Sequence, residues 1–224
     1  MLSQVESDVA EMALQTTNLF SITTSNNKQD DNLPKSDQNN DHLIKKKQFS
    51  YFFWFTGIAI ICSVLDLWTK QAVFGHLGMP GEKEMWWVWK DVFGFQTALN
   101  EGALFGMGQG FVIAFAVLSI VMLIGIVIWV LVPFSKNLFL IIIMGLVSGG
   151  IVGNLYDRLG FHQLRWNDSF HSPDSPVYAV RDWILVMIGS YHWPNFNLAD
   201  SYLVCGVICL AIYTLFFTDK AVQK

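Results

Sequence analysis

The fold is decided by an uncharged stretch, LFLIIIMGLVSGGIVGNLY, which occupies residues Leu138–Tyr156. A helix that crosses a bilayer needs about 20 consecutive residues that are mostly apolar. Three further stretches meet this requirement and also lack charged side chains: Phe49–Leu65, Gly110–Val132 and Ser201–Thr218. The sequence therefore predicts an all-α membrane protein with four transmembrane helices.

The composition agrees with a membrane protein. Hydrophobic residues make up 53% of the chain and charged residues 14%, and the mean hydropathy is +0.39. A soluble domain has about 25% charged residues, so this chain has too few to cover a surface that faces water. The formal net charge is −4, and no basic stripe with interleaved aromatic residues is present. Nucleic acid is therefore not expected as a partner.

The predicted spans divide the chain into three parts. Residues 1–47 hold much of the charge and most of the Asn and Gln, and we expect a disordered cytoplasmic extension there. Residues 48–219 are expected to form the four-helix membrane domain, and residues 220–224 a cytoplasmic tail. Lys45–Lys47 immediately precede the first span, which favours a cytoplasmic N-terminus. Four spans then place both termini in the cytoplasm and the segments at about 71–109 and 157–197 outside.

The outer segment 71–109 is rich in aromatic residues, which favour the boundary between membrane and water. Glycine and proline interrupt it, so long helices are not expected, and short strands lying at the boundary are plausible. The aromatic residues are Trp86, Trp87, Trp89, Phe93 and Phe95.

Polar residues stand at the outer ends of the first and last spans, and each pair has an ordinary structural explanation. Asp66 and Lys70 are four residues apart, the spacing of a local ion pair that would let the first helix end at the interface. Asn197 is followed three residues later by Asp200, which resembles a helix capping box.

The third span also ends in polar residues, Asn154, Asp157 and Arg158, of which the arginine could extend toward the interface beside a polar partner. The segment Asn100–Gly102 lies just before the second span. All these groups fall on the same side of the membrane, and the inner ends of the spans hold nothing comparable. Polar side chains near a bilayer are costly, so their gathering on one side predicts a functional site.

At these residues the sequence resembles the signal peptidase II family, the lipoprotein signal peptidases. The resemblance covers about residues 50–218 and rests on four motifs in order. These are Asp66-Leu67-Trp68-Thr69-Lys70 for D-x-x-T-K, Asn100-Glu101-Gly102-Ala103-Leu104-Phe105 for N-x-G-A-A-F, Gly149–Arg158 for G-G-x-x-G-N-x-x-D-R, and Phe196-Asn197-Leu198-Ala199-Asp200 for F-N-x-A-D.

The resemblance implies a four-helix bundle with a small extracytoplasmic β cradle, and it implies two catalytic aspartates. One is Asp200; the other is Asp182 of Val180-Arg181-Asp182, where Arg181 replaces a residue that is usually apolar in the family. The stretch between Arg158 and Asp182 is longer than usual and leaves Asp168 and Asp174 as alternatives. Residues implied to bind substrate or support the site are Asp66, Lys70, Asn100, Gly102, Asn154, Asp157, Arg158, Asn197 and Ala199.

The resemblance also implies the reaction and its setting. Family enzymes remove the signal peptide of diacylglyceryl-modified prolipoproteins and cut before the lipidated cysteine. We therefore expect an aspartic endopeptidase of the bacterial cell inner membrane, with its site on the outer, periplasmic face. Its partners would be lipid-modified prolipoproteins and membrane lipid, and it would act as a monomer without a metal or other cofactor.

Other functions fit the sequence less well. A transporter would need polar groups at mid-membrane, whereas the centres of the spans hold only apolar, Gly, Ser, Thr and Cys residues. A serine protease could use Ser148, but no histidine lies on a span to act as its base. No H-E-x-x-H motif of a zinc protease is present. A small transporter or a non-enzymatic scaffold remains the alternative to the peptidase.

Overall fold

The computed structural model describes residues 35–102, 108, 110–132, 137–167 and 169–217. The predicted tail, Asp168 and Ala103–Phe105 of the second motif lie outside the described residues. The chain divides into two compact units, residues 1–49 and 50–224. Of the first unit, only the part of a helix that begins at Lys35 is described, and the predicted boundary at residue 47 falls within this helix.

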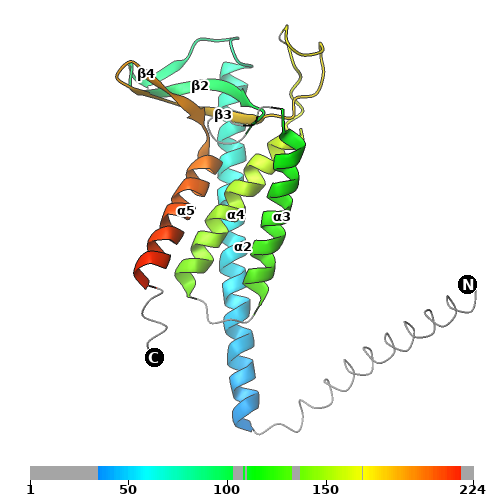
Figure 1. Cartoon of the computed structure of the whole chain (residues 1–224), viewed down its shortest axis with the longest axis vertical. Helices are drawn as coiled ribbons and strands as arrows, with labels where there is room; N and C mark the ends of the chain where they lie inside the picture. Colours follow the sequence, from blue (N-terminus) through cyan, green and yellow to red (C-terminus); the bar gives the residue numbers. More distant parts are fainter. Residues whose placement is uncertain (1–34, 103–107, 109, 133–136, 168, 218–224) are drawn as a thin grey trace, which may run out of the picture. The chain divides into compact units, whose positions relative to one another are not determined.

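The second unit holds the membrane helices and a small sheet, in the order α2, β1, β2, α3, α4, β3, β4 and α5 (Figure 1). In the described part of the chain, four helices are long and apolar enough to cross a membrane. The helices are α2 (Lys35–Leu77), α3 (Val112–Leu131), α4 (Leu138–Arg158) and α5 (Leu198–Phe217). The predicted fold class is confirmed.

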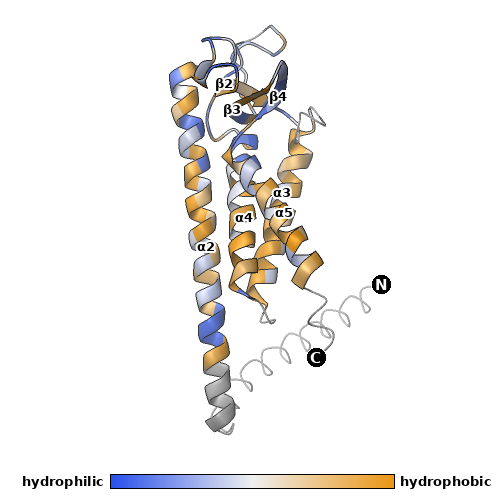
Figure 2. Cartoon of the chain, turned by 90° about the vertical axis from the view of Figure 1, so that its left-hand side faces the viewer, coloured by the Kyte–Doolittle hydropathy of each residue, from blue (hydrophilic) through white to orange (hydrophobic). Residues whose placement is uncertain are grey.

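Most of the length of α3, α4 and α5 is hydrophobic (Figure 2). On α3 the buried residues are Ala116 and Val130, and most of the other apolar side chains are exposed or partly exposed. In water such a surface would be unfavourable, whereas lipid tails are a suitable solvent for it. By contrast, α4 has many buried residues and forms the centre of the helix packing.

The close packing of α2 against α4 depends on two glycines of α4. A Cβ atom on Gly149 would lie 2.5 Å from Cβ of Cys62, and one on Gly153 would lie 2.2 Å from Oδ2 of Asp66. The hydroxyl of Ser63 donates to the carbonyl oxygen of Gly149 at 3.1 Å. Small residues four apart allow membrane helices to approach closely, and here they bring Asp66 next to α4.

The four strands form one antiparallel sheet in the order β1-β2-β3-β4. The sheet lies at the end of the helices where α4 stops and α5 starts (Figure 1). Residues far apart in sequence meet in it: Ala98 pairs with Asp182 and Asn100 with Val180. The strands are β1 (Trp86–Trp89), β2 (Phe93–Asn100), β3 (Val180–Ile188) and β4 (Tyr191–Phe196).

The end of α2 differs from the prediction that the first span stops near Asp66. The helix continues to Leu77, so residues 71–77 are helical rather than part of an irregular outer segment. The reason is packing, because buried Phe74 contacts Trp183 and Ile184 of the sheet. The helix stops just before Gly78, whose φ of 80° favours glycine and whose N–H donates to the carbonyl oxygen of Phe74 at 2.9 Å.

Candidate active site

The two predicted catalytic residues meet at one asparagine, Asn197. Its side-chain Nδ2 donates to Oδ1 of Asp182 on β3 at 2.6 Å. Its backbone N–H donates to Oδ2 of Asp200 on α5 at 3.2 Å. Since Asn197 is fully buried between the end of β4 and the start of α5, the two carboxyl groups are held on either side of a single residue.

Asp182 lies in a buried position on β3, with 2% of its surface exposed. Its second oxygen, Oδ2, accepts a hydrogen bond from Nδ2 of Asn100 on β2 at 3.2 Å. Burial raises the pKa of Asp182 well above its ordinary value, and the nearby charge of Asp200 raises it further. Asp182 therefore retains its proton at a pH where an exposed carboxyl group would be ionised.

Asp200 occupies the first turn of α5 and has two roles there. Its Oδ2 accepts from the backbone N–H of Asn197, while Oδ1 of Asn197 accepts from the N–H of Asp200 at 3.0 Å. This reciprocal pair is the predicted capping box. The other oxygen, Oδ1, accepts from Nδ2 of Asn154 on α4 at 2.9 Å. The cap fixes the carboxyl group and leaves one oxygen directed at α4.

Lys70 is the centre of the polar cluster and is completely buried. Its Nζ lies 2.7 Å from Oδ2 of Asp66 and 3.1 Å from Oδ2 of Asp157, and it donates to Oδ1 of Asn154 at 2.9 Å. An ammonium group can only donate, so Lys70 fixes the amide of Asn154 with its oxygen inward. The amide nitrogen of Asn154 then faces Asp200.

The predicted ion pair of Asp66 and Lys70 is therefore present, but its expected place at the end of a helix was wrong. Both side chains are fully buried within α2, which continues beyond them. Oδ1 of Asp66 accepts from the backbone N–H of Ala199 at 2.9 Å. Because Ala199 adjoins Asp200, this contact attaches the start of α5 to α2.

Arg181 is a part of the site that the motifs did not assign. Its Nε and Nη2 donate to Oδ1 of Asp157 at 3.0 and 2.9 Å, and its backbone N–H donates to Oδ2 at 3.0 Å. Its Nη1 donates to Oε1 of Gln71 at 3.2 Å. Arg181 thus connects β3 to both α4 and α2, one residue before Asp182. The unusual cation in an otherwise apolar position was the sequence signal that could have identified it.

The Arg158 side chain contacts a different part of the chain from its neighbour Asp157. Its Nη2 donates to the carbonyl oxygen of Gly102 at 3.1 Å, and its guanidinium lies 5.6 Å from the ring centre of Phe115 on α3. The N–H of Gly102 donates to Oδ1 of Asn100 at 2.9 Å. These contacts fix the segment after β2, and with it the Asn100 side chain that contacts Asp182.

Of the two alternative aspartates, the structure describes Asp174. Asp174 lies in an exposed loop with φ of 60°, and Asp168 is outside the described residues. All predicted supporting residues contact the cluster around Asp182 and Asp200 or a member of it. In the described part of the chain, no group of three His, Cys, Asp or Glu side chains is placed to hold a metal ion.

Comparison with known proteins gives a consistent result. The model of the family described as signal peptidase (SPase) II matches residues 58–216. The lipoprotein signal peptidase of Rhodopirellula baltica is 42% identical over 160 residues, which cover 70% of each chain. That of Bacillus velezensis is 33% identical over 167 residues, covering 75% of this chain and 97% of the relative.

A solved structure is also similar. A bacterial membrane enzyme determined by the in meso method at 2.3 Å resolution matches with a TM-score of 0.59 and 26% sequence identity. The match covers 75% of this chain and 89% of the other.

Proposed function

This chain belongs to the signal peptidase II family, the membrane peptidases that remove lipoprotein signal peptides, and from that membership we propose that Asp182 and Asp200 are its catalytic pair. The observation that supports the pair most directly is Asn197, which donates a hydrogen bond to each carboxyl group. The peptidase is thereby proposed to be of the aspartic type. The comparisons do not favour the transporter or scaffold alternative.

The proposed mechanism follows from two carboxyl groups that share one proton. Two nearby carboxylates do not both ionise readily, so the pair as a whole retains one proton. Asp182 holds this proton because burial and the charge of Asp200 raise its pKa. Asp200 accepts a proton from the attacking water, and Asp182 donates its own to the nitrogen that leaves. Acid–base assistance of this kind contributes about 10²–10⁴ in rate.

The surrounding residues are proposed to position the pair rather than to react. Lys70 orients Asn154, which contacts Asp200, and Arg158 fixes the segment that presents Asn100 to Asp182. Replacing them by alanine should give graded losses of activity. Asp66, Asp157, Gly102, Asn197 and Ala199 complete this supporting set.

The test of the pair compares single variants on a lipidated precursor peptide. Asp182→Asn and Asp200→Asn should each insert and fold but lose at least about 10²-fold in cleavage rate. Asp174→Asn, an exposed carboxyl group in the same connection, is the matched control and should retain activity. Near-normal activity of Asp182→Asn together with a loss in Asp174→Asn would assign the second acid to the loop.

We further propose that the substrate is a diacylglyceryl-modified prolipoprotein, cut before the lipidated cysteine. The acyl chains can remain in the membrane while the peptide reaches the end of the helices, and each buried CH₂ contributes about 0.8 kcal/mol to binding. The same precursor without its lipid should therefore be cleaved far more slowly. Equal cleavage of both forms would contradict this proposal.

The chain is an integral membrane protein, and its orientation is a proposal. Lys45–Lys47 beside the first span support a cytoplasmic N-terminus. Both termini would then be cytoplasmic and the catalytic pair would face the outside of the bacterial inner membrane. A monomer is proposed because the side chains of the described cluster bind one another within a single copy of the chain, so the proposed site needs no second copy. Cysteine labelling of intact cells at His192→Cys, which lies on β4, would report on the side of the sheet.

A further inference from the structure

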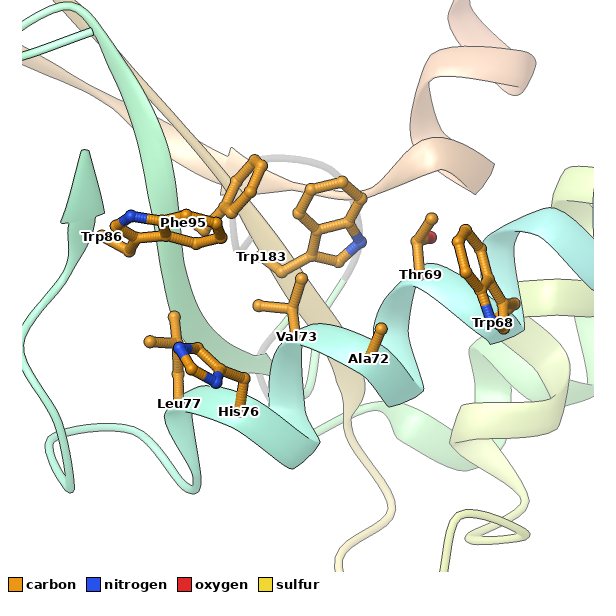
Figure 3. Close-up of a pocket in the computed structure, with 9 residues that line it drawn as sticks. All are labelled: Trp68, Thr69, Ala72, Val73, His76, Leu77, Trp86, Phe95 and Trp183. Atoms are coloured by element: carbon orange, nitrogen blue, oxygen red, sulfur yellow. The ribbon is translucent and has the colours of Figure 1, made fainter. Parts of the chain in front are cut away.

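A cavity of about 330 Å³ lies between the end of α2 and the sheet. Figure 3 shows its walls, with Ala72 and Val73 from α2 facing Trp86, Phe95 and Trp183 from three strands. The rings of Phe95 and Trp183 are packed edge to face, with centres 5.2 Å apart. The cavity is therefore a preformed apolar pocket with rigid aromatic sides.

One polar group in the pocket wall has no partner. Trp183 is 7% exposed, and no described residue accepts a hydrogen bond from its Nε1. Figure 3 shows this nitrogen on the edge of the ring that faces Trp68 and Thr69. The Thr69 hydroxyl already donates to backbone carbonyl oxygens of Leu65 and Asp66. A buried indole N–H normally has an acceptor, so the pocket is chemically incomplete.

The residues that line the pocket indicate which kind of ligand would fit it. A water molecule in a cavity needs two to four polar partners, whereas the described lining of this pocket is mainly apolar and its one buried donor without a partner is the Trp183 N–H. A suitable ligand is long and apolar and has a single acceptor, which describes an acyl chain with its ester carbonyl. Trp68, at the edge of the pocket, is 66% exposed, so this edge of the pocket lies at the outer surface of the membrane helix α2.

The pocket is also separate from the catalytic pair. Consecutive side chains of a strand point to opposite faces. Asp182 contacts Asn100 and Asn197, whereas Trp183 faces α2. The scissile region of a substrate lies at Asp182, on the other side of β3. We infer that the pocket binds an acyl chain of a bilayer glycerophospholipid, whose ester carbonyl accepts a hydrogen bond from Nε1 of Trp183.

The experiment measures retained lipid by native mass spectrometry of the full chain, released from bilayers of one phosphatidylcholine. Diacyl phosphatidylcholine is compared with the dialkyl ether form of equal chain length, which lacks the carbonyl. The wild type should retain the diacyl lipid roughly two- to tenfold more, the effect of one neutral hydrogen bond. Trp183→Phe should abolish this preference, and Trp89→Phe, an exposed tryptophan of β1, should keep it.

A second variant tests the pocket without changing the donor. Ala72→Phe places a ring in the cavity from an exposed position of α2, and it should reduce retention of both lipids. Equal retention of both lipids by the wild type, or a preference that survives Trp183→Phe, would overturn the inference. So would displacement of the retained lipid by a lipidated precursor in equimolar amount, since the occupant would then be the lipid of the substrate. The measurement uses no cleavage, so its failure leaves the proposed catalytic pair unaffected.

Discussion

Arg181 and Asp157 form a buried pair whose energetic coupling can be measured directly. We consider Arg181→Met, Asp157→Asn and the double variant. In Arg181→Met, Asp157 loses the Nε and Nη2 donors and keeps the backbone N–H of residue 181. Its remaining cation is Lys70, which Asp66 also uses. Two fully buried carboxylates would then share one ammonium group.

The expected magnitudes follow from this charge balance. Removing one partner of a buried pair costs about 3–5 kcal/mol. Because the backbone hydrogen bond survives in Arg181→Met, this variant should lose about 3 kcal/mol of unfolding free energy. Asp157→Asn should cost a similar amount, because it leaves the Arg181 guanidinium buried beside a neutral amide. The double variant leaves the Lys70–Asp66 pair balanced. It should therefore recover about 1–3 kcal/mol relative to the sum of the single variants.

The assay is reversible unfolding in detergent micelles, with the four proteins compared under identical conditions as a double-mutant cycle. Lys90→Met is the control for the loss of a positive charge, because Lys90 is exposed, and it should unfold like the wild type. Single variants as stable as the wild type, or a double variant equal to the sum of the two, would refute the reasoning. In that case the buried pair between β3 and α4 would not contribute to the unfolding free energy.

Two further predictions concern packing and proton affinity. Gly153→Ala should lower the unfolding free energy by about 1–3 kcal/mol, because its Cβ would meet Asp66 Oδ2 at 2.2 Å. Gly125→Ala, which has open space around the added atom, is the control and should not lower it. Equal thermal unfolding of the two variants would contradict this prediction. Asn100→Leu removes a hydrogen bond that lowers the pKa of Asp182. Activity falls as pH rises through that pKa, so the alkaline limb of kcat/KM should move to higher pH in Asn100→Leu, and a move to lower pH would contradict the proposed acid.

The helices and the polar residues at their ends could be predicted because local patterns determine them, whereas Asp182 was implied by the resemblance to a family. A long apolar run forms a membrane span. Polar residues are costly in the middle of a span, so those of these segments stand at the ends. The cap formed by Asn197 and Asp200 depends only on residues three apart. The spans and the cap could therefore be predicted from short sequence patterns.

Long-range contacts could not be predicted in the same way. The extension of α2 to Leu77 depends on the packing of Phe74 against Trp183, more than 100 positions later in the chain. The pairing of β2 with β3 and the bonds of Arg181 to Asp157 depend on how the elements meet in space. No local pattern identifies which of several acids a buried arginine will contact.

The order of the elements has a consequence for biosynthesis. Asp200 and Asn197 belong to the last helix and its entry, and their partners come from α2, α4 and β3. A nascent chain therefore lacks Asp200, one member of the proposed acid pair, until α5 has been synthesised and inserted. Under the proposed mechanism, a product truncated before α5 would lack Asp200 and would be inactive.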